Sequence, residues 1–190
     1  MPRAHPGRPA AIGESLERVE SETAYEGKIV DVRTDTFRYA DGDTAEREIV
    51  VHPGAVAVVA HDDAHVWLVR QPREAVEVAD LLELPAGKLD VDGESPLEAM
   101  KRELVEEIGK EADEWRELKR FYTSPGFAQE EVWILVATGL RDVDYDPDTD
   151  ERIEIVPWPL ADLGSAIAEC ADSKTLIGLL LFERDRAQAA

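Results

Sequence analysis

The stretch of residues 87–110, GKLDVDGESPLEAMKRELVEEIGK, carries complete start and stop signals for one short helix. Ser95 is a favourable N-cap, Pro96 suits the first helical position, and Glu98, three residues after the serine, completes a capping box. Gly109 is a favourable residue for ending the helix in the left-handed conformation. The stretch therefore predicts a glycine-bearing loop followed by a helix that ends at Gly109.

The two sides of this helix differ in chemistry. Four apolar residues recur at helical spacing and predict a buried stripe, namely Leu97, Met100, Leu104 and Ile108. Glu103, Glu106 and Glu107 share the opposite side, where neighbouring like charges oppose each other by about 0.2–0.5 kcal/mol per pair. A divalent cation would turn this repulsion into binding, because Mg²⁺ takes oxygen ligands from a few carboxylates together with substrate phosphates. The alternative is a merely solvated acidic face.

Length and charge narrow the possible functions. A chain of 190 residues is typical of one domain with a small appendage. Its 42 acidic residues outnumber its 21 basic ones and give a net charge of −21, which repels phosphates and disfavours non-specific binding of nucleic acid. An anionic nucleotide substrate would therefore need a locally basic pocket and metal ions.

Other site classes are excluded by what the sequence contains. Cys170 is the single cysteine, so the chain can form neither an internal disulfide nor a thiolate zinc site. No apolar run reaches membrane-spanning length, and the N-terminus has no hydrophobic signal core. The sequence predicts a cytoplasmic protein without a membrane partner.

Three segments follow one another along the chain. Residues 1–20 begin with many proline, alanine and glycine residues and are expected to form a flexible tail. Residues 21–52 alternate in polarity around an Asp41-Gly42 hairpin turn and predict a small antiparallel β-sheet. Such a sheet is too small to stand alone, so it needs a partner surface.

Residues 53–186 predict the main domain. The continuous apolar run AVAVVA at residues 55–60 indicates a fully buried strand. Further strands are expected at residues 66–69, 81–84, 118–123, 132–137 and 153–158, and helices at residues 160–168 and 173–186, the last with Ser173 as its N-cap. The sum is a mixed α/β fold with helices on both sides of a mixed sheet.

The spacing around the acidic helix resembles a family signature. Seven residues separate Glu94 from Arg102, which is followed by Glu-Leu-x-Glu-Glu-x-Gly. This resembles the box of the Nudix hydrolase family, Gly-x5-Glu-x7-Arg-Glu-U-x-Glu-Glu-x-Gly-U with U apolar. Two positions depart from it: six residues rather than five separate Gly87 from Glu94, and Lys110 stands at the final apolar position. The resemblance implies a Nudix-type α/β/α sandwich over residues 53–186.

Further segments resemble the ADP-ribose pyrophosphatase branch of that family: VRQPR at residues 69–73, LELPAG at 82–87, SPG at 124–126 and DERI at 150–153. Pro125, sixteen residues after Gly109, is a marker of this branch. The resemblance implies hydrolysis of ADP-ribose to AMP and ribose 5-phosphate by a homodimer, whose N-terminal sheet at residues 21–52 crosses to the partner subunit. Alternatives are another nucleoside diphosphate sugar, such as GDP-mannose or UDP-glucose, or a non-catalytic ligand-binding module.

The resemblance also implies a set of site residues. Mg²⁺, which Mn²⁺ can replace, would be held by the carbonyl of Ala86 with Glu103 and Glu107, and Glu106 would lie within reach of a second ion. The residues implied to contact the substrate are Arg47, Arg73, Ile29 and Gly126, with Ile29 beside the adenine. Arg102 would orient a neighbouring carboxylate, the alternative being a surface salt bridge of about 0–1 kcal/mol.

The general base is the least defined part of this site. Members of the branch carry a glutamate base two positions before a second acid, and here these two positions fall on Thr149 and Glu151. Because threonine cannot act as a base, the candidates in order are Glu151, Asp150 and Asp148, each of which can also be a solvated loop residue. The alternative is a water activated by the metal and a box glutamate, for which Glu107 is the catalytic candidate.

Overall fold

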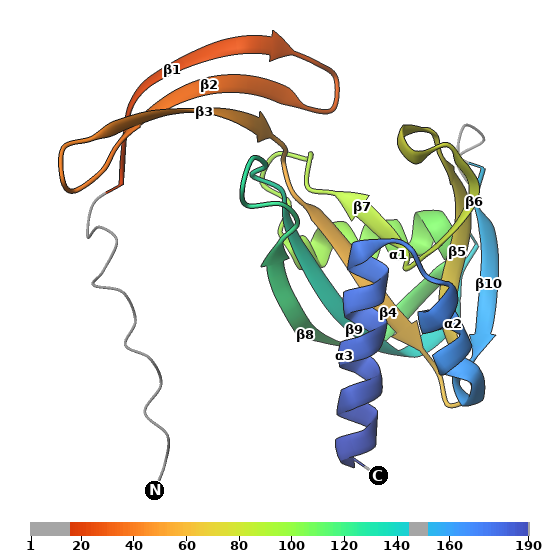
Figure 1. Ribbon diagram of the computed structural model, residues 1–190. Helices are drawn as coiled ribbons and strands as arrows, with labels where there is room; N and C mark the ends of the chain where they lie inside the picture. Colours follow the sequence, from red (N-terminus) through yellow and green to blue (C-terminus); the bar gives the residue numbers. More distant parts are fainter. Residues whose placement is uncertain (1–15, 145–151, 190) are drawn as a thin grey trace, which may run out of the picture. The chain divides into compact units, whose positions relative to one another are not determined.

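A computed structural model describes residues 16–144 and 152–189 of the chain (Figure 1). The chain divides into two compact units. The small-sheet unit comprises Met1–His52 with Ser124–Gln129, and the large-sheet unit comprises Pro53–Thr123 with Glu130–Ala190.

The small-sheet unit contains three antiparallel strands in the order β1-β2-β3, which are β1 (Glu17–Glu26), β2 (Asp31–Arg38) and β3 (Thr44–Val51). The predicted hairpin turn at Asp41-Gly42 is confirmed, since Gly42 has a φ of 91° and Asp43 N donates to Asp41 Oδ1. The first strand begins at Glu17, whereas the sequence predicts the sheet from residue 21. Every residue of β1 is exposed, so no apolar pattern marks its start.

A buried carboxylate lies within this unit. Asp35 is only 1% exposed and accepts hydrogen bonds from Ser21 Oγ at 2.6 Å, Arg33 at 3.2 Å and Arg18 at 3.5 Å. Burial alone would raise the pKa of Asp35, but the Ser21 hydrogen bond and the two arginine charges outweigh burial, and the pKa lies below its usual value. The small sheet is therefore held partly by paired charges.

The large-sheet unit is built on a seven-stranded mixed sheet with the order β10-β5-β4-β9-β8, in which β6 also pairs with β5 and β7 with β4. Its strands are β4 (Ala55–His61), β5 (His65–Arg73), β6 (Val78–Glu83), β7 (Ala86–Lys88), β8 (Lys110–Tyr122), β9 (Glu131–Asp142) and β10 (Glu154–Pro159). The pair β4–β9 is parallel and the other pairs are antiparallel.

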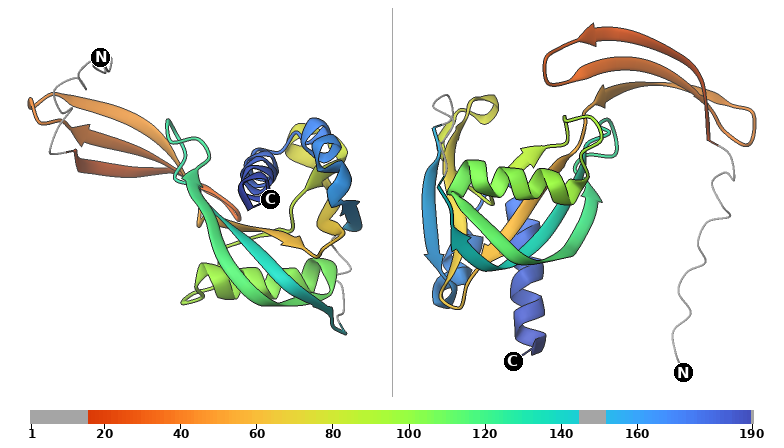
Figure 2. Two further views of the ribbon diagram at one scale, coloured as in Figure 1. Left: turned by 90° about the horizontal axis from the view of Figure 1, so that it is seen from below. Right: turned by 180° about the vertical axis from the view of Figure 1, so that it is seen from behind.

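Helices cover both faces of this sheet (Figure 2). The helices are α1 (Pro96–Ile108), α2 (Leu163–Glu169) and α3 (Ser173–Ala189), with short 3-10 turns η1 (Glu74–Val76) and η2 (Leu160–Asp162). On β4, Val56 and Val58 share a core cluster with Met100 of α1, while Val59 shares the opposite cluster with Leu179 of α3. The predicted α/β/α sandwich is confirmed, and the run at residues 55–60 is its doubly buried central strand.

Two details of the helices differ from the prediction. Leu97 is 38% exposed, and it lines a surface pocket with Trp115 and Trp133 instead of joining the buried stripe. At α3, Asp172 rather than Ser173 caps the helix, since Asp172 Oδ2 accepts the backbone N–H of Thr175 at 2.9 Å. Aspartate and serine are both good caps, so sequence alone does not choose between such neighbours. Within the described residues, no helix has the length and apolar character needed to cross a membrane.

Candidate active site

The predicted site is built around a three-residue segment that is hydrogen-bonded to the central strand, β4. Val58 N of β4 donates to Pro85 O at 3.0 Å, and β7 pairs Ala86 with Ala57 and Gly87 with Val56. The Pro85-Ala86-Gly87 segment is thereby attached to the most deeply buried strand of the unit. A backbone carbonyl in this segment has a well-defined position.

Helix α1 has the start and end that the sequence predicts. Ser95 Oγ accepts the N–H of Glu98 at 3.3 Å, and Glu98 Oε2 accepts the N–H of Ser95 at 2.9 Å, which completes the capping box. These hydrogen bonds hold the pKa of the exposed Glu98 below its usual value. Gly109 ends the helix with a φ of 63°. The caps fix which residues of α1 face the sheet and which face the segment at Ala86.

Glu103 and Glu107 of α1 both reach that segment. Glu107 is 6% exposed, and its Oε2 accepts the N–H of Ala86 at 2.9 Å. The carboxyl group of Glu103 lies against Gly87 so closely that a Cβ atom there would come within 2.0 Å of Glu103 Cδ and Oε1. Only glycine leaves room for this carboxylate. The structure thus brings together Ala86, Glu103 and Glu107.

Arg102 bridges the neighbouring carboxylates. Its Nη1 donates to Glu103 Oε1 at 2.8 Å and to Glu106 Oε2 at 2.9 Å. Its Nε and Nη2 donate to the two carboxylate oxygens of Glu94 at 3.2 and 3.0 Å. The hydrogen bonds to Glu94, the charge of Glu103 and the hydrogen bonds to Glu103 and Glu106 raise the pKa of Arg102. One guanidinium therefore serves three carboxylates, and negative charge is in excess.

The donor set suits a hard dication by its chemistry. Every candidate ligand is an oxygen, from a carboxylate or from the backbone carbonyl of Ala86, and Mg²⁺ prefers such ligands. Over residues 16–144 and 152–189, however, no three or more His, Cys, Asp or Glu side chains already surround a common point. Glu103 and Glu106 turn towards Arg102, while Glu107 turns towards Ala86 N. Metal binding would require these side chains to exchange partners.

Arg73, a predicted substrate contact, lies in the same unit at the end of β5. Its Nε and Nη2 donate to the two oxygens of Glu83 at 2.6 and 2.7 Å. Glu83 is fully buried and also accepts a hydrogen bond from Lys174 Nζ at 2.6 Å. The hydrogen bonds to Glu83 raise the pKa of Arg73 against the opposing effect of burial, and the charge of Glu107 raises it further. Arg73 is therefore electrostatically coupled to Glu107 of α1.

Sequence reasoning missed Glu83 and Lys174. The alternation of Leu82, Glu83 and Leu84 in a strand predicts that Glu83 points away from the two leucines to an exposed face, so the sequence carried no signal of its burial. No signal identified the partner, since Lys174 lies 91 residues further along the chain.

The remaining predicted site residues are not in this unit or not described. Arg47, Ile29 and Gly126 belong to the small-sheet unit. Arg47 donates to Glu46 O and to the hydroxyl of Tyr39, Ile29 is 62% exposed, and Gly126 has open space where a side chain would stand. The three base candidates, Asp148, Asp150 and Glu151, lie outside the described residues.

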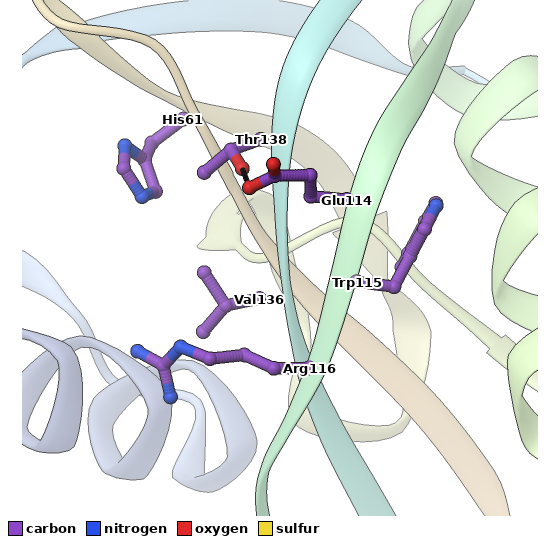
Figure 3. A pocket seen from close by; sticks show the side chains of 6 residues that line it. All are labelled: His61, Glu114, Trp115, Arg116, Val136 and Thr138. Carbon is purple, nitrogen blue, oxygen red and sulfur yellow. Dashed lines mark hydrogen bonds between the residues drawn. The ribbon is translucent and has the colours of Figure 1, made fainter.

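A pocket lies elsewhere on the large-sheet unit. This pocket of about 280 Å³ is lined by residues of β4, β8 and β9 that Figure 3 labels: His61, Glu114, Trp115, Arg116, Val136 and Thr138. Thr138 Oγ1 donates to Glu114 at 3.3 Å across its rim. It contains none of the predicted site residues, so the pocket adds nothing to the site at Ala86.

Comparison with known proteins fits this architecture. The chain matches the NUDIX domain family over residues 50–177. It is 38% identical to an ADP-ribose pyrophosphatase of Mycobacterium tuberculosis, over 87% of this chain and 82% of that protein. It is 36% identical to an ADP-ribose pyrophosphatase of Bacillus subtilis, over 93% and 98% of the two chains, and 36% identical to the methanol dehydrogenase activator of Bacillus methanolicus, over 89% and 93%.

The fold has its own match among solved structures. A crystal structure of an ADP compounds hydrolase superposes with a TM-score of 0.82, covering 95% of this chain and 99% of that one at 24% identity. At this identity the likeness speaks for the fold alone. The family match covers most of the chain and includes the capped acidic helix, Gly87 and Ala86. The chain therefore belongs to the Nudix hydrolase family.

Proposed function

We propose that this protein is a Mg²⁺-dependent hydrolase that cleaves the diphosphate of ADP-ribose to AMP and ribose 5-phosphate, with Mn²⁺ able to replace Mg²⁺. The observation that carries the proposal is the packing of Glu103 against Gly87 and of Glu107 against Ala86 N. The names of the relatives from Mycobacterium tuberculosis and Bacillus subtilis support ADP-ribose as the substrate.

The proposed metal ligands are the carbonyl of Ala86 and the carboxylates of Glu103 and Glu107, with Glu106 available for a second ion. When bound, the metal neutralises charge on the diphosphate and makes a water a better nucleophile. Glu103 and Glu106 would then give up their hydrogen bonds to Arg102 Nη1. Arg102 would keep its place, because Glu94 holds it through two other nitrogen atoms.

Arginine side chains are proposed to bind the diphosphate. A guanidinium donates two parallel hydrogen bonds to phosphate oxygens and offsets part of the chain's net charge of −21. Arg73 has this role in the large-sheet unit, and Arg47, Ile29 and Gly126 are the proposed contacts in the small-sheet unit. The proposed base is Glu151, then Asp150, then Asp148, with Glu107 as the alternative.

The assembly proposed for this enzyme is a cytoplasmic homodimer. The small sheet of β1, β2 and β3, which includes most of the predicted residues 21–52, would be used in dimerisation, and residues 53–186 would form the hydrolase domain. Large apolar side chains exposed in the small-sheet unit, among them Leu16, Tyr25 and Ile29, support a covered surface there. Analytical ultracentrifugation tests this assembly, and a monomer at micromolar concentration would contradict it.

The deciding experiment is a panel of nucleoside diphosphate derivatives, including ADP-ribose, GDP-mannose and UDP-glucose, with identification of the products. We expect ADP-ribose to give AMP and ribose 5-phosphate, the activity to vanish with a chelator, and the activity to return with Mg²⁺ or Mn²⁺. Preference for another sugar nucleotide would change the substrate. Binding of ADP-ribose without turnover of any member would indicate a non-catalytic module.

A further inference from the structure

Glu83 is a fully buried carboxylate at the point where three elements of the large-sheet unit meet. It ends β6, and it accepts hydrogen bonds from Arg73 at the end of β5 and from Lys174 in the first turn of α3, at 2.6–2.7 Å. A buried charge is costly unless it is paired and hydrogen-bonded, so these partners offset the cost of burying Glu83. Their geometry is consequently well defined.

A second set of hydrogen bonds holds Lys174, one of the two cations that pair with Glu83. Lys174 Nζ lies 3.0 Å from Asp172 Oδ2, which also accepts from the hydroxyl of Thr175 at 2.6 Å. The same hydroxyl oxygen accepts the N–H of Leu84 at 2.8 Å, and Thr175 is fully buried. Glu83 and the residue after it are thus both tied to the first turn of α3.

Arg73, the other cation that pairs with Glu83, is open to solvent. Glu83 engages Nε and Nη2 of Arg73, and the side chain of Arg73 remains 40% exposed. The same arginine is coupled through space to Glu107, which contacts the N–H of Ala86. The guanidinium therefore has a fixed plane, set by the buried carboxylate, and an edge that is exposed to solvent.

We infer that Glu83, itself held by Lys174, is a positioning residue that orients the Arg73 guanidinium towards the substrate diphosphate. This inference rests on the proposed function, in which Arg73 binds the diphosphate. Neither Glu83 nor Lys174 needs to touch the substrate. Their effect would be to remove the rotational freedom of Arg73 before the substrate arrives, which lowers the entropic cost of binding.

The direction in which KM changes in Glu83→Gln distinguishes an orienting role of Glu83 from a simple effect of its charge. Glu83→Gln removes a negative charge beside two cations, so an effect of charge alone would strengthen diphosphate binding and lower KM. The amide of glutamine, however, presents a donor where Arg73 needs an acceptor, so the guanidinium would lose its fixed plane. Positioning therefore predicts that KM rises although the site becomes more positive. A purely structural role would lower the melting temperature and leave KM unchanged.

Glu131→Gln is a matched control. Arg120 donates to Glu131 through Nε at 2.5 Å and Nη2 at 2.7 Å, which repeats the two-bond geometry of Arg73 and Glu83 on β8 and β9. With ADP-ribose we expect Glu83→Gln to raise KM about tenfold, the loss typical of one charge-assisted hydrogen bond, and to change kcat less than about threefold. Glu131→Gln should leave both values unchanged. Glu83→Gln should add nothing further in an Arg73→Ala background.

A lower or unchanged KM in folded Glu83→Gln would overturn the inference. If that variant fails to fold, Lys174→Met replaces it, in the wild type and in an Arg73→Ala background. A KM that Lys174→Met raises only when Arg73 is present supports positioning, because an effect of charge alone would persist without Arg73. An unchanged KM, or an equal rise in both backgrounds, overturns the inference. Calorimetric affinity for ADP-ribose is measured in parallel. If the wild type binds ADP-ribose without cleaving it, the proposed function fails while the order of affinities still decides the inference. If the wild type neither binds nor cleaves ADP-ribose, the proposed function and the inference are both overturned.

Discussion

Helices α1 and α3 pack on opposite faces of the same sheet, and both contact the short segment from Glu83 to Gly87. From one side, α1 contacts it through Glu107 at Ala86 N and through Glu103 at Gly87. From the other side, α3 contacts it through Lys174 at Glu83 and Thr175 at Leu84 N. The segment is therefore held from both faces, but by different chemistry.

The difference lies in the charge balance. Around α1, one guanidinium is shared by the three carboxylates of Glu94, Glu103 and Glu106, so negative charge is in excess. Around the start of α3, the carboxylates of Glu83 and Asp172 face the cations Arg73 and Lys174, so the charges balance. The first arrangement gains from an added dication, and the second does not. Substitutions on the α1 side should therefore affect catalysis, and those at the start of α3 should affect the orientation of Arg73.

Glu107→Gln has the largest expected effect. Glutamine can still accept the N–H of Ala86 through its amide oxygen, so the fold should persist, but the carboxylate needed for the metal is lost. We expect kcat to fall at least about 100-fold, since metal ions contribute several kcal/mol to such reactions. Steady-state kinetics with a melting curve measures both quantities. Glu117→Gln, on the exposed surface of β8, is the control, and near-normal turnover in Glu107→Gln would remove this residue from the metal site.

Gly87→Ala should affect activity more than stability. The new Cβ would stand 2.0 Å from the carboxyl carbon of Glu103, so this flexible side chain must move away from the segment. We expect kcat to fall roughly 10- to 100-fold, because a displacement of about 1 Å in a catalytic group can have that effect. The melting temperature should change little.

Gly164→Ala on α2 is the matched control for that change, since nothing lies within 4 Å of its added Cβ. It should keep full activity. Equal losses in Gly87→Ala and Gly164→Ala would mean that the contact between Gly87 and Glu103 has no part in catalysis. A large fall in melting temperature in Gly87→Ala would point to a structural role for the glycine instead.

The parts of the molecule that sequence predicted are those with local signals. The limits of α1 follow from Ser95, Glu98 and Gly109, which lie within one stretch of chain and act on neighbouring backbone atoms. The central strand follows from its uninterrupted apolar run, which is typical of burial on both faces. The strand β1 carried no such signal, because all of its residues are exposed.

Contacts between distant residues could not be predicted in this way. Lys110 departs from the family's apolar position, yet it is 8% exposed: its ammonium lies 3.8 Å from the centre of the Trp67 ring and pairs with Asp142. An apolar ring and a carboxylate from two other strands together make a lysine acceptable there. The pairing of Glu83 with Lys174 has the same character. Such partners become visible only when the fold brings them together.

The smallest expected effect is on the free energy of unfolding, in variants at the first turns of α1 and α3. Ser95→Ala removes the hydroxyl that accepts the N–H of Glu98, and should lower the free energy of unfolding by about 1 kcal/mol. Ser173→Ala should change it by less than about 0.5 kcal/mol, because Asp172 provides the cap of α3. Chemical denaturation of both variants measures the difference. Equal losses would mean that Ser173 also caps its helix, whereas a fall in kcat for Ser95→Ala beyond the loss of folded protein would mean that the cap also sets the position of Glu103 and Glu107.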